Sequence, residues 1–386
     1  MKRRDFLITV FCSLLIFSLV LYYVFLVKDS PEGEPLEVFV GVDVAYDNIA
    51  EIERLVDEIS NYTNLFVIGS VGISYDEVKL NACQEMCQYV YEKGFSFMIY
   101  SDMPPREEWF VCYNVDCANE WGDKFLGLYA FDEGGGRQLD LITPRPFRVD
   151  EAENVTDAGS QFVSRATERL IWYRQGFNSS MNFPLFTSDY ALYWFDYKAG
   201  YDVVFAEFGW NYSRQLNVAL CRGAATVQNK DWGVMITWTY NKPPYIESGE
   251  ELYDDMILAY ENGAKYIVIF DSNEDYSHGI LEEEHFEALE QFWEYAQNNP
   301  RTSKKINDRV AYVLPKDYGY GFRGPNDKIW GLWEADDFSL ELCTNLGSLL
   351  EQYGNKLDII YDDGLNSSNT NAYAKLIFWN GTVSDR

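Results

Sequence analysis

Acidic residues stand where short apolar segments of the chain end. The sharpest group contains Asp132 and Glu133, which precede three consecutive glycines and Arg137. A second acid, Glu207, ends the segment 203–207 and is followed by Phe-Gly-Trp. Two carboxyl groups in different surroundings can divide the work of a general acid and of a base or nucleophile. We therefore take Glu207, with Asp132 or Glu133 as its partner, as the candidate catalytic residues.

The neighbouring residues favour this assignment. Aromatic surroundings should raise the pKa of Glu207, which would keep it protonated as a general acid. If the strand runs through Asp132 and Glu133, their side chains point to opposite sides, so one of them should face the ligand. The glycines 134–136 permit a sharp turn and leave room for a ligand beside the backbone, and Arg137 can hold one carboxylate. The alternative to a catalytic role is a structural one: Asp132 and Glu133 would form an ordinary acidic turn, and Glu207 would form an ion pair with an Arg or Lys of the barrel.

Further acids and aromatic residues follow the other apolar segments. Acids accept hydrogen bonds from hydroxyl groups, and flat aromatic rings can stack on sugar rings, although a single ring more often serves packing. The candidate substrate-binding residues are Asp43, Tyr46, Asp102, Arg137, Asp189, Trp194, Trp210, Trp238, Tyr240 and Asp271, with Trp109 and Tyr197 as further rings at the same end.

Eight apolar segments must position these side chains. They cover residues 38–43, 65–70, 95–102, 125–133, 183–189, 203–207, 234–240 and 266–271. Most are followed by a helical stretch, and near-continuous apolar strands separated by helices are typical of a parallel sheet buried on both faces. Eight such strands predict a closed (β/α)8 barrel, whose chemistry lies at the C-terminal ends of the strands.

A second, smaller α/β domain is expected after the barrel. We place the barrel at residues 37–300 and the small domain at 301–386, with strands near 309–314, 357–361 and 374–379 and a helix near 339–353. This strand–helix–strand order predicts a short parallel sheet. No Gly-x-Gly-x-x-Gly motif follows its first strand, so nothing indicates nucleotide binding.

The first residues predict a membrane anchor. Lys2, Arg3 and Arg4 precede an uninterrupted apolar stretch from Phe6 to Val27, which is long enough to span a bilayer. We expect an uncleaved transmembrane helix at residues 1–28, with a cleaved signal peptide as the alternative, a linker at 29–36 and an extracellular globular part. Glycosylation signals agree with this topology, at Asn61, Asn154, Asn178, Asn211, Asn366 and Asn380.

Composition excludes several other functions. A net charge of −30 and a pI near 4.3 argue against nucleic acid as a partner. The chain has only His278 and His285, too few for a multi-histidine metal site, so we expect neither a metal nor another cofactor. In an exported chain, disulfides among Cys83, Cys87, Cys112 and Cys117 are expected, with a zinc site as the weaker alternative. Cys221 and Cys343 are expected to be single thiols.

The arrangement of these residues resembles the glycoside hydrolase (β/α)8 barrel superfamily. The resemblance lies in an Asp-Glu turn after the fourth strand, Phe131–Gly136, a Glu ending the sixth, Ala206–Trp210, aromatic strand ends, and a small α/β domain behind the barrel. The largest clan carries Asn-Glu at strand four and a second Glu at strand seven. The present acids at strands four and six are instead similar to those of α-glycosidase clans.

The resemblance implies an enzyme that cleaves glycosidic bonds between a carboxylate pair. The expected protein is a membrane-anchored extracellular glycoprotein with a carbohydrate substrate. The alternative is a non-catalytic glycan-binding or cell-envelope protein on the same scaffold, because a fold does not fix a function. The separation of the two carboxyl groups should distinguish retention from inversion of the sugar configuration.

Overall fold

A computed structural model describes residues 37–74, 80–101, 120–142, 148–176, 183–301, 308–363 and 365–385. The described residues of 38–296 and of 308–385 belong to one compact unit. The expected anchor at 1–28 and the linker at 29–36 lie outside the described residues. Among the helices that are described, none has both the length and the apolar character needed to cross a membrane.

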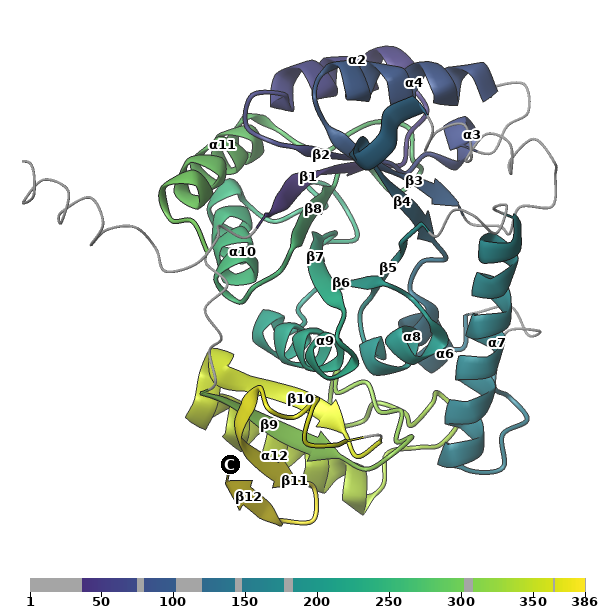
Figure 1. Cartoon of the computed structure of the whole chain (residues 1–386), viewed down its shortest axis with the longest axis vertical. Helices are drawn as coiled ribbons and strands as arrows, with labels where there is room; N and C mark the ends of the chain where they lie inside the picture. The colour runs from purple at the N-terminus through teal and green to yellow at the C-terminus, as the bar shows by residue number, and fades with distance from the viewer. Residues whose placement is uncertain are drawn as a thin grey trace, which may run out of the picture. The chain divides into compact units, whose positions relative to one another are not determined.

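Eight parallel strands close into a barrel in chain order, as the sequence predicts (Figure 1). Each strand pairs with the next, and β8 pairs with β1. The strands are β1 (Phe39–Val44), β2 (Leu65–Ile68), β3 (Ser96–Ser101), β4 (Phe125–Ala130), β5 (Leu185–Asp189), β6 (Val203–Phe208), β7 (Asp231–Ile236) and β8 (Tyr266–Phe270).

Helices cover the outside of this ring (Figure 1). They are α2 (Ile49–Ile59), α3 (Val71–Ser74), α4 (Leu80–Glu92), α6 (Gly134–Leu139), α7 (Val155–Gly176), α8 (Tyr193–Ala199), α9 (Arg214–Gln228), α10 (Gly249–Glu261) and α11 (Glu283–Asn298), with a 3₁₀ turn, η2 (Gly122–Lys124), before β4. Several begin at side-chain caps; Ser248 and Glu251, for example, form a capping box at α10.

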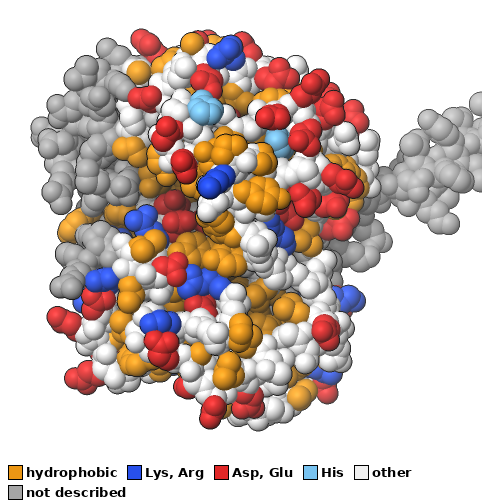
Figure 2. Space-filling view, turned by 180° about the vertical axis from the view of Figure 1, so that it is seen from behind, with side chains coloured by type: hydrophobic (Ala, Val, Ile, Leu, Met, Phe, Trp, Pro, Cys, Tyr) orange, Lys and Arg blue, Asp and Glu red, His pale blue; other side chains and the backbone are white. Residues whose placement is uncertain are grey.

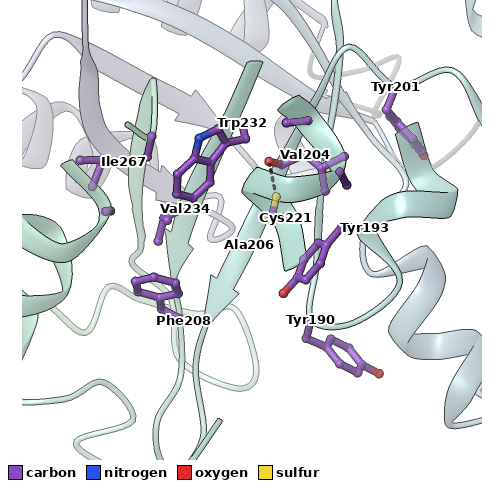
Figure 3. Close-up of a cluster of buried hydrophobic side chains, with 14 of the residues drawn as sticks. Tyr190, Tyr193, Tyr201, Val204, Ala206, Phe208, Cys221, Trp232, Val234 and Ile267 are labelled. Atoms are coloured by element: carbon purple, nitrogen blue, oxygen red, sulfur yellow. Dashed lines mark hydrogen bonds between the residues drawn. The ribbon is translucent and has the colours of Figure 1, made fainter. Parts of the chain in front are cut away.

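The alternation of side chains separates two cores. Rings and aliphatic groups that point into the barrel form one cluster, which includes Phe39, Val203, Phe205 and Tyr266. The alternate residues of the same strands point outward and pack under the helices. Figure 3 shows this outer side at β6 and β7, where Val204, Ala206 and Phe208 lie in a cluster with Cys221.

The seventh strand begins earlier than the apolar pattern predicts. It runs from Asp231 to Ile236, in register with β6 from Val203 onward. Residues 237–240, which the sequence analysis assigns to this strand, follow it as part of a loop. Because β7 begins with the polar Asp231 and contains Gly233, hydrophobicity alone does not reveal where the strand starts.

A second sheet of four strands follows the barrel, in the order β10-β9-β11-β12. Its elements are β9 (Arg309–Leu314), α12 (Asp337–Tyr353), η4 (Gly354–Lys356), β10 (Leu357–Tyr361), β11 (Tyr373–Phe378) and β12 (Val383–Asp385). The three predicted strands are parallel neighbours, as expected. The short antiparallel β12 was not predicted.

Helix α9 joins the barrel to the second sheet within the same compact unit. A Cβ on Gly223 would stand only 2.4 Å from the Ile359 carbonyl oxygen. The backbone of α9 therefore packs directly against the backbone of β10 at this point. Beside this contact, the Arg222 guanidinium donates to the buried Asp358 carboxylate at 2.7 Å. The helix that follows the Glu207 strand is thus fixed on its outer side as well.

Candidate active site

Strand phase decides which polar side chains enter the barrel. Glu207 is in phase with Val203 and Phe205, which belong to the inner cluster. Ser188 is in phase with the inner Phe186, and Asp43 with the inner Phe39. These three polar groups therefore lie at the C-terminal end of the barrel interior, on strands β1, β5 and β6.

A single hydroxyl bridges two of the candidate carboxyl groups. The Ser188 Oγ lies 2.6 Å from Asp132 Oδ1 and 2.5 Å from Glu207 Oε1. The Tyr129 hydroxyl, from β4, lies 2.6 Å from the same Asp132 oxygen and 2.9 Å from Ser188 Oγ. Two contacts of 2.6 and 2.5 Å through one atom place Asp132 Oδ1 and Glu207 Oε1 no more than 5.1 Å apart.

The residues after β4 leave the strand at once. The strand ends at Ala130, and Phe131 and Glu133 both take left-handed backbone conformations, with φ of 54° and 55°. The Glu133 amide donates to the Ser188 carbonyl at 3.0 Å, which ties the turn to β5. Strand alternation therefore does not apply to Asp132 and Glu133. The expectation that their side chains point to opposite sides assumed that the strand continues through both residues, whereas β4 ends before them.

Two of the three glycines after Glu133, Gly135 and Gly136, are closely packed against other parts of the protein rather than facing open space. The three glycines begin α6, and a Cβ on Gly136 would stand 2.1 Å from the ring of Tyr190. A Cβ on Gly135 would lie 2.8 Å from the Asp189 carboxylate, which accepts the amides of Gly135 and Gly136 at 2.5 and 2.9 Å. An anion at a helix N-terminus is stabilised there, so Asp189 fixes the start of α6.

Asp189 and Asp271 consequently face away from the barrel interior. Asp189 also accepts the amides of Tyr190 and Ala191, and a hydrogen bond from the buried Asp196 carboxyl group. Asp271 accepts the amides of Ile280 and Leu281 and the Tyr46 hydroxyl. Both acids stabilise loop backbone rather than entering the barrel interior with Glu207.

The pKa values of the three central acids are all raised. Burial, followed by the charges of Glu133 and Asp132, raises the pKa of Glu207 well above its ordinary value. Burial, with the charges of Asp132 and Asp189, raises the pKa of Glu133 to about 8. Burial also raises the pKa of Asp132, but the Ser188 and Tyr129 hydroxyls and the Arg137 charge oppose this rise. Asp132 is therefore the acid whose anion is best supported.

Asp43 adds a further carboxyl group beside this cluster. It is only 3% exposed, and burial and the charge of Asp132 raise its pKa well above the ordinary value. Its Oδ1 atom has no hydrogen-bond partner among the described residues. A Cβ on Gly69 would lie 2.1 Å from that oxygen, so only glycine at the end of β2 leaves space for it. An unpaired buried oxygen of this kind can accept a hydrogen bond from a ligand.

The expected aromatic contacts divide into exposed and buried rings. Trp210 and Tyr240 are 40% and 46% exposed on the loops after β6 and β7. Trp238 is half-buried, with its ring between Tyr245 and Phe270.

Three other expected rings offer no open face. Tyr46 bonds to Asp271, Trp194 packs on Tyr361 of the second sheet, and Tyr197 donates to the Asp231 carbonyl, all three being buried. The remaining two candidates, Asp102 and Trp109, lie outside the described residues.

Sequence reasoning missed Ser188 and Tyr129, although strand phase contains a signal for both. Ser188 is two residues after the inward Phe186, so the same alternation that turns Asp189 outward turns Ser188 inward. A β-bulge at Gly127, with φ of 139°, obscures the phase of Tyr129. A search restricted to acids and exposed rings passes over both hydroxyls.

The other chemically active residues lie apart from this cluster. In the described part of the chain, no group of three His, Cys, Asp or Glu side chains has the arrangement of a metal site. His285 is buried and bonds to the Glu282 amide and the Glu247 carbonyl. Cys83 and Cys87 are buried on α4. Because Cys112 and Cys117 lie outside the described residues, disulfide pairing remains a prediction.

A cavity of about 660 Å³ lies elsewhere, on the outer side of the barrel between α2 and α11. Its lining includes Tyr46, Glu51, Arg54, Glu290 and Asp271. None of the inward acids contributes to it, so this cavity is not where the hydroxyl-bridged carboxyl groups lie. We locate the candidate active site from the carboxyl geometry.

Known proteins resemble the chain in fold only. No protein-family model matches the sequence, and no curated protein matches it. An α-L-fucosidase from Paenibacillus thiaminolyticus has a TM-score of 0.52 at 10% identity, over 88% of this chain and 59% of that one.

Two further neighbours match less well. A β-glycosidase has a TM-score of 0.44 at 9% identity, over 72% and 99% of the two chains. A GH30 endoxylanase from Clostridium papyrosolvens has 0.42 at 10%, over 70% and 74%. The likeness to the α-L-fucosidase is one of fold and agrees with the eight-stranded parallel barrel that the sequence resemblance implied, and no particular family is indicated.

Proposed function

We propose that the protein is a retaining glycoside hydrolase in which Asp132 is the nucleophile and Glu207 the acid and base. The observation that carries the proposal is the hydroxyl bridge, which holds the two carboxyl oxygens within 5.1 Å of each other. Retaining glycosidases have carboxyl groups about 5 to 5.5 Å apart, whereas inverting ones need roughly 6.5 to 9.5 Å to admit water.

The hydrogen bonds support this division of roles. Tyr129 and Ser188 both reach Asp132 Oδ1, which leaves Oδ2 for a substrate. With both hydroxyls donating to Asp132, the short contact between Ser188 and Glu207 requires a proton on Glu207, which the raised pKa of Glu207 supplies. Glu207 then begins the reaction as a protonated acid and Asp132 as an anion.

The reaction follows in two displacements. In the first, the Glu207 proton moves to the glycosidic oxygen as the bond from that oxygen to the anomeric carbon breaks, and Asp132 Oδ2 forms an ester with this carbon. In the second, ionised Glu207 takes a proton from water, and the water oxygen displaces Asp132 from the sugar. Asp43 accepts a hydrogen bond from the sugar at its unpaired Oδ1 atom.

The cellular location is part of the same proposal. The Phe6–Val27 stretch would anchor the chain in a membrane with the barrel outside. The asparagines of five glycosylation signals, Asn61, Asn154, Asn211, Asn366 and Asn380, are exposed, as acceptor sites must be. The sixth, Asn178, lies outside the described residues. A carbohydrate substrate at the cell surface fits this orientation.

The deciding experiment replaces Glu207 by Gln in the full chain. General acid–base catalysis contributes roughly 10² to 10⁴ in rate, so Glu207→Gln should lose about that factor on a glycan that the parent cleaves. Binding of the same glycan, measured by calorimetry, should persist. The anomer first released by the parent, observed by NMR, should keep the configuration of the substrate.

A matched control is Glu274→Gln, which removes an exposed acid from the loop after β8 and should leave turnover unchanged. Full activity of Glu207→Gln would remove the catalytic assignment, and an inverted first product would remove Asp132 as nucleophile. If the parent binds members of a broad glycan panel but cleaves none, the protein is a glycan-binding protein instead.

A further inference from the structure

Three successive loops at the barrel mouth each expose one large aromatic side chain. These are Trp210 after β6, Tyr240 after β7 and Tyr276 after β8, with exposed fractions of 40%, 46% and 53%. Strands β6, β7 and β8 are neighbours in the barrel, so their loops leave the same side of the mouth. We call these three residues the aromatic arc.

Backbone contacts hold the three loops together. The Trp210 amide donates to the Trp238 carbonyl at 2.8 Å, which joins the first loop to the second. The Trp238 indole donates to the Ser272 carbonyl at 2.7 Å, which joins the second to the third. Neighbouring loops connected in this way present their side chains at fixed spacing, which reduces the entropy lost when a ligand binds.

Each end of the arc is also fixed within its own loop. Arg214 donates to the carbonyls of Gly209 and Trp210 and forms ion pairs with Glu247 and Asp255. Trp210 and Tyr276 have left-handed backbones, with φ of 48° and 54°. Such conformations are uncommon for bulky residues, and here they keep large rings in solvent, where burial does not stabilise them.

The loop of Tyr276 is braced by Asn273. The Asn273 side chain bonds to Asp275, Ser277 and the His278 ring, and the Tyr276 amide donates to the Asn273 carbonyl. The two histidines of the chain, His278 and His285, both follow β8. Figure 2 shows the face on which they lie, where hydrophobic side chains gather among charged ones. The exposed ring therefore stands on an ordered loop.

The arc is continuous with the carboxyl cluster. The Tyr129 hydroxyl lies 3.8 Å from Met235 Sδ on β7, the strand that leads to Trp238 and Tyr240. Partial burial, followed by the charges of Asp132 and Glu133, raises the pKa of Tyr276, so the Tyr276 hydroxyl lies within electrostatic reach of the carboxyl cluster. A chain bound at Asp132 and Glu207 that leaves the mouth on this side passes over the arc.

We infer that the aromatic arc binds successive sugar rings of a glycan chain, so that the preferred substrate is an oligosaccharide or polysaccharide rather than a single glycoside. Sugar rings present C–H faces that stack on aromatic rings, and three spaced platforms serve a chain of units. This inference rests on the proposed hydrolase and names its substrate class.

The experiment compares substrates of different length. An aryl glycoside that the full-length parent cleaves identifies the sugar, and oligomers of that sugar with two to six units form the series. The parent should show kcat/KM rising with length. Trp210→Asn, Tyr240→Ala and Tyr276→Asn should each lower the ratio of kcat/KM on the hexamer to that on the aryl glycoside by about two- to tenfold, the range expected for one stacked ring. Asn suits the two left-handed positions.

Two controls keep the result specific. Tyr276→Phe retains the ring and should retain the ratio, and Trp172→Ala removes an aromatic residue of similar exposure from α7, with both rates unchanged. Equal kcat/KM at all lengths, or an equal loss in Trp172→Ala, would overturn the arc while leaving the hydrolase in place. Failure to cleave the aryl glycoside and every oligomer would instead overturn the hydrolase.

Discussion

The Ser188 hydroxyl has one hydrogen, but it contacts an oxygen of Asp132 and an oxygen of Glu207. The bridge between the two acids therefore needs a second hydrogen. By donating to Asp132, the Ser188 hydroxyl lowers the pKa of that acid relative to the value that burial alone would give. Hydrogen bonds to charged groups are worth about 1.5 to 3 kcal/mol. Ser188 is therefore a positioning residue that also sets the protonation of the two acids.

Ser188→Ala should shift the pH profile of activity. Without the hydroxyl that donates to it, Asp132 has a higher pKa, so the acidic limb of the kcat/KM profile should move to higher pH, with kcat lower by about ten- to a hundredfold. Ser70→Ala is the control, because Ser70 accepts the Ile73 amide and does not touch the acids. An unchanged profile in Ser188→Ala would contradict the bridge.

Glu133 links protonation to stability. Its pKa is about 8 in the folded protein and near 4.5 when unfolded, so between these values the folded state holds a proton that the unfolded state has released. The contribution of Glu133 to the free energy of unfolding is therefore fully present below pH 4.5 and is lost as the pH rises through about 8. The slope for one proton is at most about 1.4 kcal/mol per pH unit.

Glu133→Gln cannot ionise, so its free energy of unfolding should fall less than that of the parent between pH 5 and pH 8. Urea titrations at the two values measure the difference. Glu151→Gln, at an exposed position, should follow the parent. Equal slopes for Glu133→Gln and the parent would show that Glu133 ionises normally in the fold.

At the level of elements, the start of α6 decides where the catalytic turn lies. Gly136 faces the ring of Tyr190, whose hydroxyl bonds to Asp140 at 2.7 Å, whereas Gly134 has ordinary space for a Cβ, with its nearest atom at 3.6 Å. The two glycines are two residues apart in one helix. They therefore form a matched pair for testing close packing.

Gly136→Ala should destabilise the protein by about 1 to 3 kcal/mol, the usual cost of overpacking, and should lower activity because Asp132 and Glu133 immediately precede α6. Gly134→Ala should be neutral or slightly stabilising, since alanine favours a helix. Chemical denaturation and kcat/KM of both variants check the pair. Equal effects would mean that Tyr190 yields to a methyl group.

The strands could be predicted from the sequence because burial on both faces leaves apolar runs, and so could the place of Glu207 near the end of β6, because it ends such a run. The position of Asp132 could not be predicted, since it depends on the left-handed turn at Phe131 and Glu133 and on the link to the Ser188 carbonyl. Nor could the burial of Trp194, which results from the second sheet packing on α8. These features depend on tertiary contacts that periodicity does not contain.

At the level of the molecule, the barrel and the second sheet should unfold together. Asp358 is fully buried and accepts from Arg222 and Arg309 at 2.7 and 2.8 Å, and Arg222 also reaches the carbonyls of Asn355 and Leu357. Breaking a buried pair by removing one partner costs about 3 to 5 kcal/mol. The pair thus couples α9, which follows the Glu207 strand, to β9 and β10.

Asp358→Ala should lower the free energy of unfolding by that amount while retaining a single transition, followed by tryptophan fluorescence and circular dichroism. Asp308→Ala breaks the exposed pair with Lys356 in the same region and should change the free energy of unfolding little, because solvent screens the pair. Separate transitions for the two parts, or equal losses in the two variants, would show that the buried pair does not couple them.

Closure of the barrel also bears on aggregation. Each barrel strand has two neighbours, so among the described strands only β10 and β12 lie at the edge of a sheet. Helix α9 covers β10, with Gly223 against Ile359, and β12 has only three residues. Short edge strands give a second chain little backbone to pair with. Intermolecular strand addition, a common route to insoluble fibres, is therefore disfavoured at the edges of the described sheets.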